Sequence, residues 1–456
     1  MSNFAALFFK GSIVFMNKIK EILRIGLPIM LGQACVIILA FADNIMIGWH
    51  SVDELAASSF VNNIMNLFIM TELGFATGMT PMIGAHNGTG NIKGIGTTLK
   101  NGLIVNGIIG GISVVLLTVI YFCLGLFGQA PELMPFIKPY FIIIGISSLF
   151  ALGFNVLKQF TDGICKPMIS MTLLIGGNLL NIFGNWVLIY GKLGFPEMGL
   201  TGAGISTLVS RAVILIAFVA YIFKSKRMNE YARAIKEAVL SRSDVRCVFK
   251  MGYPIGIQMA LETSTFTFAA VMAGWLGVLE LAAHQVVLTI SQLFFLMMQG
   301  LSFAVSILVS NAFGRKDIGA IREYARKGYF MTLGISATLS IILYCFRYQA
   351  AGIFSDSPEV TALAVSLFFL LFAYQFGDGL QLCFANVLRG IQDVKPIMYA
   401  AFVSYYLIAI PSAYILGFKA GLGIQGIWLG FPIGLTLAGL FFYARYRTDL
   451  KKLRHL

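Results

Sequence analysis

The sequence contains few charged residues for its length. Asp, Glu, Lys and Arg make up only 12% of its 456 residues, whereas they account for about a quarter of a typical soluble protein. Hydrophobic residues make up 58% of the chain, and the mean hydropathy is +0.84. This balance excludes an ordinary soluble domain and indicates an integral membrane protein.

The residues and motifs of common enzyme classes are also scarce. The chain has four histidines, and its six cysteines are scattered without a CxxC pair, so we expect neither a metal cluster nor a disulfide framework. It has no nucleotide-binding glycine loop, no zinc-type His/Glu spacing and no plausible nucleophile with a base. We therefore expect no enzymatic activity and no bound cofactor. A transporter built from this chain would draw its energy from an ion gradient.

Long hydrophobic runs are abundant instead. A run of about 20 apolar residues is long enough to cross a bilayer as a helix. The sequence predicts an all-α membrane protein with twelve such spans, at residues 22–48, 54–85, 96–127, 134–158, 168–190, 200–223, 246–275, 279–311, 322–348, 358–389, 395–417 and 425–446.

Basic residues are distributed unevenly between the joints that connect these spans. With the N-terminus in the cytoplasm, 28 of the 33 Lys and Arg residues fall on the inner side and four on the outer side, while Arg211 lies inside the sixth span. This bias follows the positive-inside rule and predicts that both termini are cytoplasmic. The net charge of +13 is then a topology signal, and the expected partners are membrane lipids, not nucleic acid.

No clear cleavage site follows the first residues, so we expect no signal peptide, and Met16 offers an alternative start.

The sequence repeats itself with a period of 226 residues. Residues 24–96 align without a gap on residues 250–322, with 20 identities in 73 positions, whereas apolar sequences match by chance at roughly a tenth of positions. Because each half holds six spans, both halves enter the membrane from the same side. We therefore expect a parallel repeat about an axis along the membrane normal, with a transported substrate held between two lobes; a channel or receptor needs no such duplication but is not excluded by it. The predicted parts are an N-terminal segment 1–21, an N-lobe 22–223, a linker 224–245, a C-lobe 246–446 and a basic tail 447–456.

Acidic residues inside the spans break the symmetry of this repeat. Glu262 and Asp43 each align with an apolar residue of the other half, so packing shared by the halves does not explain them. Asp378 lies midway along the tenth span, with Tyr374 one turn earlier on the same face. A carboxylate at the centre of a spanning helix costs about 2.5 to 3.5 kcal/mol, so these acids are candidates for ion relays or cation sites. The alternative is a hydrogen bond to a neighbouring helix, and this is the role we expect for Glu72, which has no evident partner.

Neutral polar residues form a second candidate set. Asn178, Asn181 and Asn185 fall on one stripe of the fifth span, at spacings of three and four. They either line a central substrate cavity or hold helices together through hydrogen bonds. His284 and Gln285 replace two serines of the first half and are further cavity candidates, although a lone histidine in a helix is more often structural.

Several motifs together resemble the multidrug and toxic compound extrusion (MATE) family and, within it, the bacterial NorM-like branch. They are "FADNIMIG" in the first span, "GFATGMTPMIGAHNGTGN" and its counterpart "GLSFAVSILVSNAFGRKD", "NIFGNWVLIYGKLG" in the fifth, "PIGIQMALE" in the seventh, "AAHQVVLTIS" in the eighth and "FGDGLQ" with "VLRGIQD" in the tenth. The likeness runs through nearly the whole chain after about residue 16.

The resemblance implies a two-lobed, twelve-helix antiporter in the bacterial inner membrane that exports cationic, lipophilic drugs or toxins in exchange for Na⁺ or H⁺. The family's site residues match these positions: Glu262, Asp378 and Tyr374 for a cation site in the C-lobe, and Asp43, Asn181 and Asn185 for a polar site in the N-lobe. Asn185 stands where the DinF-like branch is expected to carry an acid, which argues against a proton relay confined to the N-lobe.

The coupling ion and two alternative functions remain to be weighed. Na⁺ prefers hard oxygen ligands, and the hydroxyls of Thr263, Ser264 and Tyr374 supplement the two carboxylates of Glu262 and Asp378, so we favour Na⁺ over H⁺.

A flippase for lipid-linked precursors would need a strongly basic cavity, whereas the predicted cavity is acidic. An ion channel would need a continuous polar pore, which the third, sixth, ninth and twelfth spans do not supply. We expect the working unit to be a monomer.

Overall fold

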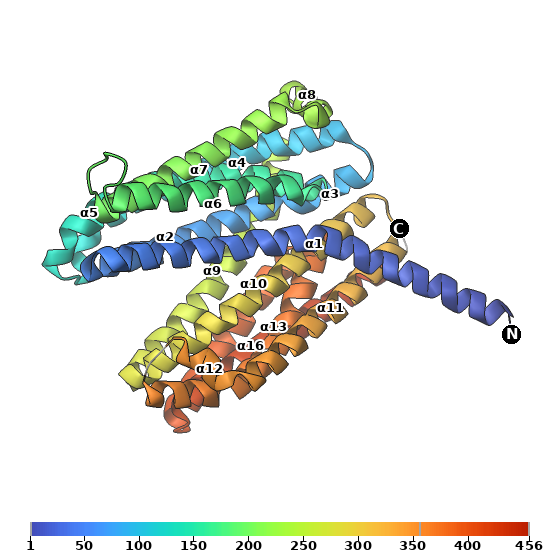
Figure 1. Ribbon diagram of the computed structural model, residues 1–456. Coiled ribbons are helices and arrows are strands. Elements are labelled where there is room, and N and C mark those ends of the chain that lie inside the picture. The colour runs from blue at the N-terminus through green and yellow to red at the C-terminus, as the bar shows by residue number, and fades with distance from the viewer. Residues whose placement is uncertain (1, 355–356, 455–456) are drawn as a thin grey trace. The chain divides into compact units, whose positions relative to one another are not determined.

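The computed structural model describes residues 2–354 and 357–454, with side chains described from residue 17 onward. In this part of the chain the secondary structure is helical and includes no strand (Figure 1). The first half contains α1 (Ser2–His50), α2 (Val52–Thr77), α3 (Met79–Gly88), α4 (Ile92–Cys123), η1 (Leu124–Phe127), η2 (Pro131–Leu133), α5 (Met134–Gly163), α6 (Pro167–Ile189), α7 (Gly199–Lys224), η3 (Lys226–Met228) and α8 (Asn229–Glu237). The second half contains α9 (Arg242–Leu276), α10 (Val278–Gly314), α11 (Ile318–Cys345), α12 (Arg347–Gly352), α13 (Pro358–Gly390), α14 (Lys395–Ala401), η4 (Phe402–Ala409), α15 (Ile410–Tyr414), η5 (Ile415–Lys419) and α16 (Gly423–Leu453).

Helices occupy all twelve predicted spans. Within the described residues, ten helices are long and apolar enough to cross a membrane. The other two predicted spans, α2 with α3 and α9, are also helical but carry acidic or basic residues along their lengths. The predicted all-α membrane fold is therefore confirmed, and the protein is a multi-pass membrane protein.

The chain forms two compact units. Unit 1 comprises Met1–Met30 and Ile257–Leu456, and unit 2 comprises Leu31–Gly256. Helix α1 thus passes from one unit to the other after Met30, and α9 does so after Gly256; these two points are separated by the period of the sequence repeat. The predicted lobes therefore exchange their first residues. Residues 22–30, the start of the predicted N-lobe, belong to unit 1, which holds most of the C-lobe. Residues 246–256, the start of the predicted C-lobe, belong to unit 2, which holds most of the N-lobe.

The last residues of these two segments, Met30 and Gly256, each pack closely against a glycine of a neighbouring helix. In unit 2, a Cβ atom on Gly74 of α2 would lie 2.5 Å from the Cα atom of Gly256 in α9. In unit 1, a Cβ atom on Gly300 of α10 would lie 2.9 Å from the Cα atom of Met30 in α1. Gly74 and Gly300 are equivalent in the repeat, as are Met30 and Gly256. The same contact therefore occurs in both units, as a parallel repeat requires.

Unit 2 has apolar packing towards both ends of its helices and polar residues between them. Helix α7 packs on both α5 and α6, and Figure 1 shows α6 running beside α7. One apolar cluster includes Val61, Ile144 and Leu200, and a second includes Ile83 and Phe160. Where each helix passes from one cluster to the other it carries a polar side chain: Glu72 in α2, Ser113 in α4, Ser147 in α5 and Arg211 in α7.

Unit 1 is built around α13. This helix packs against α10, α11 and α16, and it carries polar side chains in its buried middle. The span at 395–417 is irregular, because two π-helical stretches, η4 and η5, interrupt it. Such stretches are often found at functional sites, and η4 places Tyr405 against the interior of the unit, where it is 2% exposed.

Candidate functional site

Two predicted site carboxylates of unit 1, Asp378 and Glu262, come from two different helices, α13 and α9. Asp378 of α13 is fully buried at 0% exposure, and within the described structure neither of its oxygens has a hydrogen-bond partner. Glu262 of α9 accepts one hydrogen bond at Oε2, from Nε2 of Gln258 at 2.9 Å, while its Oε1 is buried without a described partner. The two carboxylates interact electrostatically. Three carboxylate oxygens are therefore available to a ligand.

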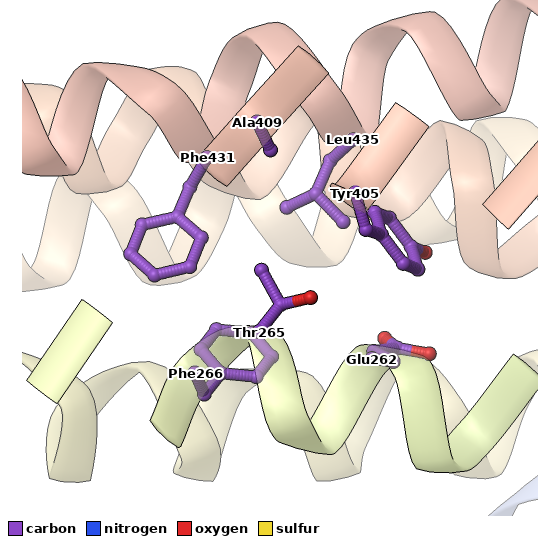
Figure 2. A pocket seen from close by; sticks show the side chains of 7 residues that line it. All are labelled: Glu262, Thr265, Phe266, Tyr405, Ala409, Phe431 and Leu435. Atoms are coloured by element: carbon purple, nitrogen blue, oxygen red, sulfur yellow. The ribbon is translucent and has the colours of Figure 1, made fainter. Parts of the chain in front are cut away.

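Two tyrosines accompany these acids. Tyr374 is 2% exposed on α13 and interacts with both carboxylates. Tyr405 interacts with the same two acids, and its hydroxyl has no hydrogen-bond partner in the described structure. It lines a cavity of about 10 Å³ together with Glu262 and Thr265, and Figure 2 shows these two residues of α9 opposite it. A cavity of this size is at the lower limit for one water molecule, so it suits a small cation better than an organic molecule.

Aromatic rings close the cavity on one side. Phe266 stacks on Phe431 with ring centroids 5.1 Å apart, and both rings contact Tyr374. His284 lies 5.5 Å from Trp428 by ring centroid and is fully buried. His284 is thus part of the packed interior of unit 1, which fits its structural interpretation.

The hydroxyl set differs from the predicted one. The hydroxyl of Ser264 lies 2.6 Å from that of Tyr406 and also donates to carbonyls of its own helix. The residues that line the cavity with Glu262 are Thr265 and Tyr405, whereas Thr263 and Ser264 do not line it. Thr265 follows Glu262 by three residues and therefore lies on the same helix face. That spacing could have identified it from the sequence.

Sequence reasoning missed Arg389. We counted this residue among the basic groups of an inner joint, but it is 4% exposed within α13. Its Nη2 donates to Oε1 of Gln258 at 2.5 Å, and its charge interacts with Glu262. The signal that could have revealed it is the helical stripe from Asp378 through Gln381 to Arg389.

The predicted polar residues of unit 2 lie together around Asp43. Nδ2 of Asn185 donates to Oδ1 of Asp43 at 2.6 Å. Asn181 satisfies its surroundings best with its amide nitrogen 3.0 Å from the same oxygen and its amide oxygen facing Thr207. Arg211 interacts electrostatically with Asp43. This carboxylate is therefore held by two amides and a nearby positive charge.

The other predicted site residues, Glu72, Asn178 and Gln285, lie outside the Asp43 contacts with Asn185 and Asn181. Glu72 is 2% exposed, and its neighbours are Ser113 and the charge of Arg211, which the sequence did not reveal because the arginine comes from α7. Asn178 donates to the carbonyl of Cys35 at 3.0 Å and so links α6 to α1, in line with the helix-linking interpretation. Gln285 is exposed on α10.

A conventional metal centre does not account for either site. Among the residues that the structure describes, no group of three or more His, Cys, Asp or Glu side chains could hold a metal ion. Unit 1 offers instead the carboxylates of Glu262 and Asp378, with Arg389 near Glu262. In unit 2, Arg211 interacts with both Asp43 and Glu72. Such a set can bind a small cation or a proton, but it holds no group arranged for covalent chemistry.

Comparisons with known proteins agree with this picture. The MatE family model matches residues 28–187 and 254–415. Two Xylella fastidiosa proteins named probable multidrug resistance protein NorM, from strains Temecula1 and 9a5c, are 29% and 28% identical to this chain over 434 residues, covering 95% of it and 92% of each relative. Among solved structures, the eukaryotic MATE transporter AtDTX14 has a TM-score of 0.86 at 20% identity, covering 97% of this chain and 99% of that one. A MOP superfamily transporter from Pyrococcus furiosus has a TM-score of 0.87 at 20% identity, covering 95% and 96%. Since the family match covers most of the chain, with one segment in each half of the repeat, the protein belongs to the MatE family.

Proposed function

We propose that the protein is a multidrug exporter that exchanges cationic, lipophilic compounds for Na⁺ by alternating access. The observation that carries this proposal is Asp378, a fully buried carboxylate with no hydrogen-bond partner in the described structure, beside the carboxylate of Glu262. An ionised carboxylate in an apolar interior is unstable unless a cation or a proton compensates it. A site that must take up a cation can serve to couple transport to an ion gradient.

The ligands around these acids favour Na⁺ over H⁺. A proton needs one carboxylate, whereas Na⁺ is better held by several oxygens, by analogy with other hard cations. Glu262 and Asp378 supply three carboxylate oxygens without a described partner, and the hydroxyl of Tyr405 adds a fourth. Glu262 also borders a cavity of about 10 Å³, which is close to the space that a single small ion or water needs.

The substrate class is supported by the relatives and by charge. Both Xylella relatives are named as multidrug resistance proteins. A cationic drug and a coupling cation compete for the same negative charge, so binding of one weakens binding of the other. Each charge moved down a potential of 100 mV is worth about 2.3 kcal/mol, enough to sustain roughly a fiftyfold drug gradient. We place the exporter in a bacterial inner membrane as a monomer, with both termini in the cytoplasm.

Ethidium efflux from proteoliposomes tests the proposal. The membrane is given an imposed Na⁺ gradient at fixed pH in one series, and an imposed pH gradient without Na⁺ in another. Efflux driven by Na⁺ supports the exchange as proposed, and efflux driven by pH alone would assign the site to protons. Movement of a lipid-linked pyrophosphate without ethidium transport would favour a flippase, and single-channel currents would favour a channel.

A further inference from the structure

Each unit combines two carboxylates with one arginine inside its membrane-spanning helices. The groups are Glu262, Asp378 and Arg389 in unit 1, and Asp43, Glu72 and Arg211 in unit 2. In the ungapped part of the 226-residue repeat, residues 24–96 against 250–322, Asp43, Glu72 and Glu262 each align with an uncharged residue of the other half. The charges of these three acids are therefore not inherited from the duplication. Both sets nevertheless carry a net charge of one negative unit.

Arg389 is linked to Glu262 through the side-chain amide of Gln258. Gln258 is 2% exposed; its Oε1 accepts from Arg389 at 2.5 Å, and its Nε2 donates to Glu262 at 2.9 Å. The amide oxygen must face the guanidinium, so the amide nitrogen must face the carboxylate. Arg389 thereby also orients Glu262. Arg389 also interacts electrostatically with Glu262, and Tyr405 interacts with Glu262, Asp378 and Arg389.

We propose that Arg389 determines the ion specificity of this site, by reducing the charge of the carboxylate pair from two negative units to one. One monovalent cation or one proton then makes the cluster neutral. A divalent cation would leave an excess positive charge in a poorly solvated interior, which is unfavourable. The same two carboxylates without the arginine would match a divalent cation, since such ions are held by carboxylate oxygens in proteins. This inference rests on the proposed function only in assuming that Glu262 and Asp378 bind a cation.

Calcium binding to the purified full-length protein in lipid nanodiscs tests this role. Radioactive calcium is titrated at about pH 8.5, well above the ordinary pKa of a carboxyl group. We expect wild type and Arg389→Lys to bind calcium no better than empty nanodiscs. Arg389→Gln removes the charge and should raise calcium affinity by at least about tenfold, which corresponds to about 1.4 kcal/mol. The double variant Arg389→Gln/Asp378→Asn restores a single negative charge and should lose the gain. An unchanged affinity in Arg389→Gln, or a gain that persists in the double variant, would overturn the proposal.

A second measurement uses only the wild type, so it does not depend on whether Arg389→Gln folds. Binding of radioactive sodium is followed while calcium is added, with choline chloride at matched ionic strength as the control. We expect calcium to displace no more sodium than choline does. Displacement by calcium at concentrations comparable to sodium would contradict the monovalent specificity. Absence of both sodium binding and ethidium transport in wild type would instead reject the proposed function, whatever the calcium titration of the variants shows.

Discussion

Asp43 of unit 2 has different hydrogen-bond surroundings from Glu262 and Asp378 of unit 1. In unit 2, Asp43 receives amide hydrogens from Asn185 at 2.6 Å and from Asn181 at 3.0 Å. In unit 1, Asp378 receives no hydrogen bond from the described structure, and Glu262 receives one from Gln258 at 2.9 Å, with the amide of Gln381 as a further polar neighbour. Both units also contain an arginine near the acids. The difference therefore lies in hydrogen bonding more than in charge.

This contrast separates two roles that an acid inside a membrane can have. A carboxylate with its own amide donors is stabilised in its charged form by the protein, whether or not an ion is present. A carboxylate without donors depends on an external cation or proton for that stabilisation. We infer that unit 1 carries the coupling site and that the Asp43 network mainly supports the fold of unit 2.

The largest effect should come from Glu262→Gln. This change keeps the size of the side chain and removes the charge that the cation needs, so Na⁺-driven ethidium efflux should fall by about hundredfold, equivalent to about 2.8 kcal/mol. Insertion and folding should be unchanged by size-exclusion elution. Asp43→Asn is the matched control from unit 2, and we expect its efflux to stay within about threefold of wild type. Equal losses in both variants would remove the distinction between the units.

Asn185→Asp should place a second carboxylate next to Asp43 in unit 2. The new carboxylate would lie where an amide now contacts Asp43 at 2.6 Å, and two carboxylates at that distance share a proton because both cannot ionise. We expect efflux to become dependent on pH, changing by about tenfold over a range in which wild type changes little. Asn185→Gln is the uncharged control. A pH profile identical to that of wild type would show that this network does not reach the transport cycle.

Replacing Asp43 should lower thermal stability more than replacing Asp378, whereas replacing an acid of unit 1 should lower efflux more. Asp43→Asn weakens two hydrogen bonds to a charged group and should lower the stability of the purified protein by about 2 kcal/mol. Asp378→Asn removes a buried charge that has no described hydrogen-bond partner, so its melting temperature should equal or exceed that of wild type. Fluorescence-monitored melting in detergent without added Na⁺ measures both. A lower melting temperature for Asp378→Asn alone would mean that this carboxylate has a structural partner after all.

The smallest effect should come from Asn178→Leu. Its amide links α6 to the Cys35 carbonyl of α1 at 3.0 Å, and such bonds between membrane helices contribute about 0.6 kcal/mol on average. We expect a slightly lower melting temperature and unchanged efflux, measured on the same preparations. A loss of efflux of several fold without a loss of stability would assign Asn178 to the substrate pathway.

Much of this architecture could be read from the sequence, because it depends on local patterns. Apolar run length predicts helices at all twelve spans, and the repeat of 226 residues predicts the equivalent contacts of Gly74 and Gly300. The exchange of the first segments of α1 and α9 between the units could not be predicted, because it depends on tertiary packing. Arg389 was missed for a similar reason: a basic residue near the end of a span looks like a topology signal until Gln258, from a distant part of the chain, is seen to accept its hydrogen bond.

The most direct test of the account is whether Na⁺ and drug affect each other's binding through Glu262. Ethidium binding to the purified protein is measured by fluorescence anisotropy with and without Na⁺, and Na⁺ binding is measured with and without ethidium. Linkage requires that each ligand weakens the other by the same factor, and we expect that factor to be about ten in wild type and one in Glu262→Gln. An equal factor in wild type and Glu262→Gln would contradict coupling through this carboxylate.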